Sequence, residues 1–278
     1  MIHLYILTYN NNQILNEWAL KSLHESEYDR DKVKVFVINN HSNIVIEEQY
    51  KQTVTVLNNV LRPDFSTGHL ARNWNQAIMR GFVNLNNPQC EYVITCHNDT
   101  IFKKDWYNNL MKHARTYNYI QLGAGDQFQM FSPTAVKYIG MNDERFCGNG
   151  VQEGDYLLRA RLYFGQHSTI NDYSHDRIHN PIEENDVIET TPLGWQHSKD
   201  IHTLYVRFHP ICYTVFKKKW QISPIEWSRY DVPFDSLEPL IDNYILYPYF
   251  ERDIITLKQQ KYVCENTPLD EICKLRTR

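Results

Sequence analysis

Residues 91–114 read EYVITCHNDTIFKKDWYNNLMKHA, and this stretch decides the expected fold. An apolar run at 91–96 has the pattern of a buried strand and ends abruptly in His-Asn-Asp at 97–99. Apolar residues at helical spacing follow at 103–114. A strand that leads into a helix is the repeating unit of parallel α/β sheets. The stretch therefore predicts a buried strand whose carboxyl end carries three polar side chains.

The same alternation of strand and helix patterns extends upstream to the start of the chain. It predicts a doubly wound, mostly parallel α/β sheet flanked by helices. After a glycine-punctuated stretch, helical character returns near Glu153, and the character of the sequence changes after residue 180. Further strands are expected at 2–8, 32–39, 53–59 and 168–174, and further helices at 10–26 and 66–82.

Composition and motifs exclude several classes of protein. The net charge of −4 over 278 residues shows no excess of basic residues, so nucleic acid is not an expected partner. No Gly-x-Gly-x-x-Gly follows the first strand, and no P-loop motif occurs. The six cysteines have no C-x-x-C spacing, which argues against structural zinc and favours free thiols. The chain has no signal-peptide pattern and no run of ~20 apolar residues, so we expect a cytoplasmic protein without a membrane span.

Polar side chains stand at the ends of three predicted strands. Parallel sheets bind ligands in a crevice beyond the carboxyl ends of their strands. The three groups are therefore expected to converge on one crevice. They are Thr8-Tyr9-Asn10 after the first strand, Asn39-Asn40-His41-Ser42 after the second and His97-Asn98-Asp99 after the fourth.

Asp99 has two interpretations. A carboxylate at a strand tip can bind a hard divalent cation and hold it against a diphosphate. Alternatively, residues 98–100 form a turn that caps the helix starting near Lys104.

Glu153 and Asp155 lie at the start of a predicted helix. Residues two apart on a helix point about 200° apart, so both would rarely face one site. One is suited to act as a general base, while Asp155 has the i, i+4 spacing to pair with Arg159. Alternatively, both carboxylates only place negative charge at the helix N-terminus.

Two other groups have the residue types of ligand sites. Arg72 and Asn73 stand early in a predicted helix, where backbone amides and an arginine suit phosphate, although a solvated surface helix has the same pattern. His167, His175 and His179 follow or flank the predicted strand at 168–174, where an imidazole can bind a metal or simply lie on the surface.

Together these elements resemble the GT-A glycosyltransferases, in particular their family-2-like group of nucleotide-sugar enzymes. The resemblance covers roughly residues 1–180 and rests on the order and spacing of several short motifs. The family's Thr-Tyr-Asn falls on 8–10, its D-D-G-S on 39–42, its Ala-Arg-Asn on 71–73 and its D-x-D on 97–99. Its E-D-x-D-L segment and downstream arginine fall on 152–156 and Arg159, and its strand-end histidine on His175.

The resemblance implies a glycosyltransferase, either a hexosyl- or a pentosyltransferase, that builds glycans or glycosylates proteins. It would move a sugar from a nucleoside diphosphate sugar, in the first instance a UDP-sugar, to a hydroxyl of a glycan or glycoprotein, with inversion and with Mn²⁺ or Mg²⁺. Compact transferases of this kind resemble the bacterial or large-virus enzymes that build surface glycans. A viral enzyme would act in the host cytoplasm. The implied residues are Glu153 and Asp155 for catalysis, Asp99 and His175 for metal, and Thr8, Tyr9, Asn10, Asn39, Ser42, Arg72, Asn73, His97 and Asn98 for the donor nucleotide.

On this interpretation residues 1–180 form the catalytic domain, and residues 181–278 an extension that packs on it and helps to shape the acceptor site. The chain departs from the family where His97 replaces the first D-x-D aspartate and Glu153 replaces the usual aspartate base. The loss of the first D-x-D aspartate leaves open a degenerate GT-A module that binds nucleotide or glycan without turnover, whereas the retention of Glu153 and Asp155 weighs against such a module. A nucleotidyltransferase is a further alternative, but its glycine-rich signature loop is absent from the N-terminal region.

Overall fold

The computed structural model describes the following residues: 1–9, 11–40, 43–58, 70–123, 125–143, 146, 151–164, 169–171, 186–189, 212–214 and 216–217. Asn10, Ser42 and His175, three of the predicted site residues, lie outside the described residues, as do His41, His167 and His179.

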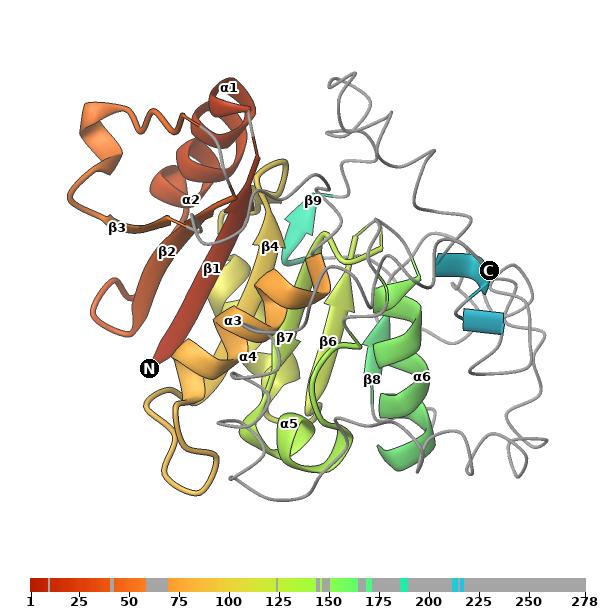
Figure 1. The fold of residues 1–278 in the computed structure, drawn as a ribbon. Helices are drawn as coiled ribbons and strands as arrows, with labels where there is room; N and C mark the ends of the chain where they lie inside the picture. The colour runs from red at the N-terminus through yellow and green to blue at the C-terminus, as the bar shows by residue number, and fades with distance from the viewer. Residues whose placement is uncertain are drawn as a thin grey trace.

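A seven-stranded sheet forms the centre of the fold, with the order β3-β2-β1-β4-β7-β6-β8 (Figure 1). All pairs are parallel except β4–β7 and β6–β7, which are antiparallel. The doubly wound, mostly parallel α/β prediction is therefore confirmed. The strands are β1 (Ile2–Thr8), β2 (Val33–Asn39), β3 (Val54–Asn58), β4 (Tyr92–His97), β6 (Tyr119–Leu122), β7 (Phe128–Phe131) and β8 (Thr169–Asn171), and a separate pair joins β5 (Ile101–Phe102) to β9 (Ile188–Glu189).

Helices cover both faces of the sheet (Figure 1). One face packs against α1 (Asn12–Ile14), the π-helical segment η1 (Leu15–Leu20) and α2 (Lys21–Glu25), which run on without a break, and against α4 (Trp106–Ala114). The other face packs against α3 (Leu70–Phe82), α5 (Pro133–Ile139) and α6 (Gln152–Phe164). A short 3₁₀ turn, η2 (Glu48–Tyr50), precedes β3.

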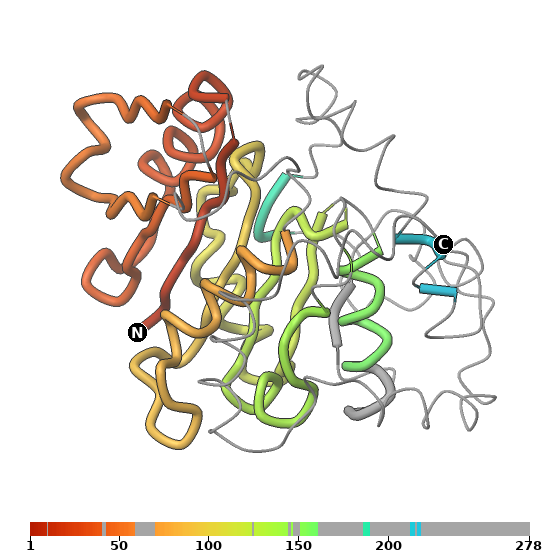
Figure 2. Tube along the Cα trace, in the orientation of Figure 1, coloured from red at the N-terminus to blue at the C-terminus, as the bar shows by residue number. Residues whose placement is uncertain are grey.

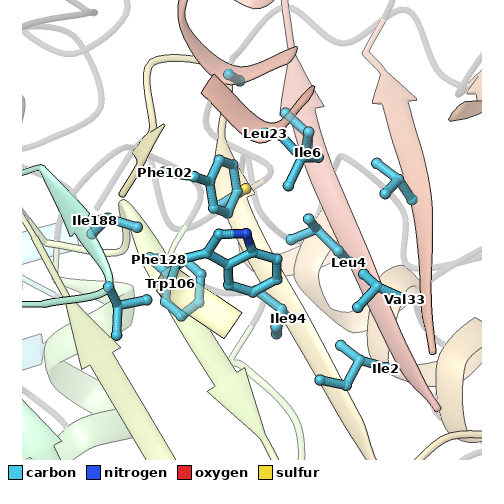
Figure 3. Close-up of a cluster of buried hydrophobic side chains, with 14 of the residues drawn as sticks. Ile2, Leu4, Ile6, Leu23, Val33, Ile94, Phe102, Trp106, Phe128 and Ile188 are labelled. Carbon is cyan, nitrogen blue, oxygen red and sulfur yellow. The ribbon is translucent and has the colours of Figure 1, made fainter. Parts of the chain in front are cut away.

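The central strands form because their apolar runs are buried on both faces. All seven residues of β1 are buried, as expected of a central parallel strand covered by helices on each side. On the α4 face, Trp106 packs at 5.1 Å between ring centroids against Phe102, among apolar side chains of β1 and β4 (Figure 3). Its indole N–H donates to Ser26 Oγ at 3.0 Å, so its polar atom is also satisfied.

The chain path sets the point at which a ligand of this sheet is expected to bind. The tube in Figure 2 leads from β1 outward to β3 and returns through α3 to β4 on the other side of β1. Strand order therefore reverses between β1 and β4, and ligands of such sheets bind at this point. Because β7 runs antiparallel to β4, the described residues of the β6–β7 turn, 123 and 125–127, lie at the same edge as the carboxyl ends of β1 and β4.

Two described parts of the C-terminal segment pack against residues of the N-terminal part of the chain. Ile188 is buried in the core on the α4 face, and the rings of Phe146 and Phe216 lie 6.3 Å apart. The division near residue 180 stays a prediction. Within the described parts of the chain, no helix is long and apolar enough to span a bilayer. Cys90, Cys96 and Cys212 are buried free thiols.

Candidate functional site

The polar strand tips meet at one edge of the sheet, as predicted. Asn98 Nδ2 donates to Thr8 Oγ1 at 3.1 Å and so links the end of β4 to the end of β1. The backbone N–H of Asn40 donates to the carbonyl of Thr8 at 3.0 Å, which links the end of β2 to β1. Asn39 Nδ2 donates to Asn58 Oδ1 at 2.9 Å. Hydroxyl and amide groups that can bind ribose or base therefore stand together at this edge of the sheet.

His97 forms an ion pair that the sequence analysis missed. Its Nε2 lies 3.2 Å from Asp126 Oδ1, and its ring stacks on Trp74 with 5.6 Å between centroids. Burial by itself lowers the pKa of His97. The charge of Asp126 and its contact with the imidazole outweigh burial and, with the charges of Asp99 and Glu153, raise the pKa to about 9. At neutral pH His97 is therefore a cation.

The carboxylate of Asp126 contacts three side chains that come from three different elements. Besides His97 on β4, Trp74 Nε1 on α3 donates to its Oδ2 at 2.7 Å, and Gln152 Nε2 on α6 donates to the same atom at 3.0 Å. Burial would raise the pKa of this carboxyl, but the charge of His97 and the three contacts lower it below its ordinary value. Asp126 is therefore an ionised carboxylate with partners on three separate elements.

Glu153 lies in the first turn of α6, next to Gln152, and is half-buried. Its Oε2 is buried and, among the described residues, has no hydrogen-bond partner. Burial raises the pKa of Glu153 to about 8, and the negative charge of Asp126 adds to the rise, while backbone hydrogen bonds and the charge of His97 act against it. A carboxylate with such a pKa is a stronger base than a solvated one.

Asp155 occupies a different environment from Glu153. It is fully buried and accepts from Arg159 Nε at 3.1 Å, so the predicted i, i+4 pair forms. Arg159 also donates to the carbonyls of Ile139 at 2.8 Å and Met141 at 2.9 Å. This pair ties α6 to the end of α5. A direct catalytic role for Asp155 stays a prediction, and its contacts are those of a residue that holds the helix.

The other predicted donor residues stand around the same edge. Arg72 and Asn73 lie in the first turn of α3, where both side chains are buried, and Tyr9 is half-buried just beyond β1. Asp99 is 7% exposed and lies two residues beyond the end of β4, and its charge helps to raise the pKa of His97. Their roles in binding a donor stay predictions.

The described side chains at this edge do not by themselves form a metal centre. Within the described ranges, no three His, Cys, Asp or Glu side chains gather closely enough to hold an ion. His97, at the first D-x-D position, has its Nε2 3.2 Å from Asp126 Oδ1, so this nitrogen faces a carboxylate instead of an open ligand position. The described residues therefore do not supply a full set of metal ligands. Of the two predicted ligands, Asp99 and His175, only Asp99 lies among the described residues.

Asp126 is the main site residue that the sequence analysis did not find. It lies in the turn between two antiparallel strands, whereas the alternating strand-helix pattern directed attention to parallel strand ends. The available signal was Gly-Ala-Gly-Asp at 123–126, in which two glycines precede an acidic residue shortly before the apolar run of β7. Both glycines adopt positive φ, 80° at Gly123 and 65° at Gly125, as a tight turn requires.

The chain is similar to known proteins in structure but not in sequence. No protein-family model matches the chain, and no curated protein matches it. Similar solved structures include S. aureus TarS 1–349 in complex with UDP-GlcNAc, at 11% identity and a TM-score of 0.47 over 99% of this chain and 90% of that one. They also include the mannosyltransferase PcManGT from Pyrobaculum calidifontis in complex with GDP-Man and Mn²⁺, at 13% identity and a TM-score of 0.46 over 99% and 78%. At these values we draw no inference about activity from either structure.

Proposed function

We propose that this chain is a glycosyltransferase that moves a sugar from a nucleoside diphosphate sugar to a hydroxyl of a glycan or glycoprotein acceptor. The observation that carries the proposal is the half-buried Glu153 beside the ionised Asp126, at the sheet edge where the tips of β1, β2 and β4 converge. A base of raised pKa next to a crevice of ribose- and phosphate-binding groups suits attack by a hydroxyl on an activated sugar.

In this proposal Glu153 removes the proton of the acceptor hydroxyl as its oxygen attacks the anomeric carbon. The bond from that carbon to the diphosphate oxygen breaks, and the nucleoside diphosphate leaves with the bonding electrons. A single base on the face opposite the leaving group gives inversion of configuration. Thr8, Asn39 and Asn98 hold the base and ribose, and Arg72 offsets the charge of the leaving diphosphate.

The identity of the donor and the need for a metal cofactor are more specific proposals within the same function. A UDP-sugar is the first donor to test, followed by a GDP-sugar. The Mn²⁺ or Mg²⁺ implied by the family resemblance would have Asp99 as its described ligand, but no step here depends on a metal. A cytoplasmic location and the hexosyl or pentosyl class stay predictions.

Thermal unfolding with a panel of nucleotides tests donor binding. UDP, GDP, UDP-GlcNAc, UDP-glucose and GDP-mannose are added with and without Mn²⁺. Ligand binding to the folded state stabilises it by ~2.7 kcal/mol at a hundredfold excess over Kd, which raises the melting temperature. A shift that needs Mn²⁺ supports a metal-bound diphosphate, whereas a shift without Mn²⁺ removes the metal from the proposal. No shift with any compound contradicts the donor site.

Turnover is tested by the release of UDP or GDP from the donor that gives the largest shift. Removing a general base costs roughly 10²- to 10⁴-fold in rate, so Glu153→Gln should retain donor binding and lose that much activity. The matched control is Glu48→Gln, whose side chain is 88% exposed. Binding without release in the wild-type protein would instead support a module that binds the donor without turnover.

A further inference from the structure

We propose that Asp126 is the positioning residue of this site, and that it holds His97, Trp74 and Gln152 in one arrangement from which Glu153 is presented to the crevice. The inference rests on the proposed transfer reaction and adds to it a residue that does not touch the reacting atoms. It names one carboxylate in the β6–β7 turn as the common anchor of α3, β4 and α6.

The contacts of Asp126 leave little freedom to the groups around it. Its two oxygens face three nitrogen atoms on three separate elements, at 2.7 Å, 3.0 Å and 3.2 Å. A carboxylate can accept all three contacts, because each oxygen offers two lone pairs and neither carries a hydrogen. Hydrogen bonds to an ionised acceptor are about twice as strong as neutral ones, and Asp126 is 5% exposed, so water does not compete for them.

The turn that carries Asp126 is itself fixed. Gln121 Nε2 donates to the carbonyl of Gly125 at 2.8 Å, and the backbone N–H of His97 donates to the carbonyl of Gln127 at 3.0 Å. Thr100 Oγ1 donates to that same carbonyl at 3.0 Å. The residues on both sides of Asp126 are therefore bonded to β6 and to the tip of β4, so its carboxylate has a defined location.

Glu153 depends on this location in two ways. Its neighbour Gln152 is bonded to Asp126, which docks the first turn of α6 on the β6–β7 turn. The backbone of Gly125 also lies against the Glu153 side chain, since a Cβ at Gly125 would be 3.4 Å from Glu153 Oε1. Asp126 therefore sets where the proposed base stands. A misplacement of about 1 Å costs up to about 100-fold in rate.

The first test compares Asp126→Asn with Asp186→Asn in the full chain. Asp186 Oδ1 lies 3.4 Å from His113 Nε2 at the end of α4, so it is a matched carboxylate–histidine pair outside the site. Nucleotide release is measured with whichever of UDP-GlcNAc, UDP-glucose and GDP-mannose the wild type uses best. Asp126→Asn should lower kcat about 10- to 100-fold and change the donor KM less than about threefold. Asp186→Asn should change neither by more than about twofold.

A second measurement does not need turnover. The effect of Glu153→Gln on the free energy of unfolding is followed from pH 5 to pH 9, first in the wild-type chain and again in the Asp126→Asn variant. The charged groups that act on Glu153 are Asp126 and His97. If Asp126 contacts the Glu153 environment as proposed, its replacement should shift the midpoint of this pH dependence to lower pH. An unchanged midpoint would mean that Asp126 does not act on Glu153 and would overturn the inference.

The outcomes separate this inference from the function itself. If the wild type releases no nucleotide, the proposed transfer fails, and the unfolding midpoint alone decides whether Asp126 acts on Glu153. If the wild type is active and Asp126→Asn matches it in kcat, the positioning role is overturned. Should Asp126→Asn not fold, Gln152→Met removes one donor to Asp126 and leaves the carboxylate in place. That variant should lower kcat about 5- to 10-fold with the donor KM retained, and an unchanged kcat would overturn the inference.

Discussion

Replacing Glu153 with Gln is expected to make the protein more stable while removing its activity. The substitution keeps the shape of the side chain and removes its ability to ionise. Burial and the charge of Asp126 raise the pKa of Glu153 from its ordinary value of 4.5 to about 8. Between these two values the folded protein holds a proton that the unfolded chain releases. The stability of the wild type therefore falls as pH rises from 4.5 through 8.

The size of the effect follows from that window. At about 1.4 kcal/mol per pH unit, the cost to the wild type is about 3 kcal/mol at pH 7 and approaches about 5 kcal/mol above pH 9. Glutamine does not titrate and avoids this cost. Glu153→Gln should therefore match the wild type near pH 4.5 and exceed its free energy of unfolding by about 3 kcal/mol at pH 7.

The assay is urea unfolding followed by circular dichroism at pH 5, 7 and 9. Glu48→Gln is the control, because an exposed substitution should stay within about 0.5 kcal/mol of the wild type at each pH. A difference between Glu153→Gln and wild type that is absent, or that does not grow with pH, would refute the reasoning. It would mean that Glu153 is solvated and not the proton-holding group described above.

Three further outcomes are expected. The kcat/KM of transfer should rise with pH through about 8, where Glu153 becomes the carboxylate that a base requires; a pH–rate profile checks this. Burial, with the charges of Lys34 and the amino terminus, lowers the pKa of His3 to about 4. The free energy of unfolding should therefore fall by about 3 kcal/mol as pH drops from 6.5 to 4, and His3→Phe should remove that loss in urea titrations. Arg159→Met removes one partner of the fully buried Asp155–Arg159 ion pair and should cost about 3–5 kcal/mol in the same experiment.

The elements found from the sequence are those whose signal is local. The predicted strand at 2–8 matches β1 residue for residue, and 32–39 differs from β2 by one residue. Both are continuous apolar or β-branched runs that end in polar residues, so no distant partner is needed to recognise them. The predicted helix at 103–114 likewise contains α4, whose buried residues recur at helical spacing.

The missed elements have signals that depend on tertiary partners. Gln121 and Gln129 interrupt the apolar runs of β6 and β7, yet both are buried because the Tyr119 hydroxyl pairs with each of them. Such glutamines are typical of surface positions until the partner is known. Helix α5 did have local signals, with Ser132 as N-cap before Pro133 and Gly140 at its end, but it is too short to show a clear period.

The sequence by itself determined the α/β class, the edge of the sheet that carries the polar residues, and the Asp155–Arg159 pair. These follow from periodicity, strand ends and helical spacing, which are properties of neighbouring residues. Only the tertiary structure decided that His97 pairs with Asp126, that Asp126 anchors three elements, and that Glu153 has a raised pKa. Burial and charge act through space, and the groups responsible come from parts of the chain that only folding brings together.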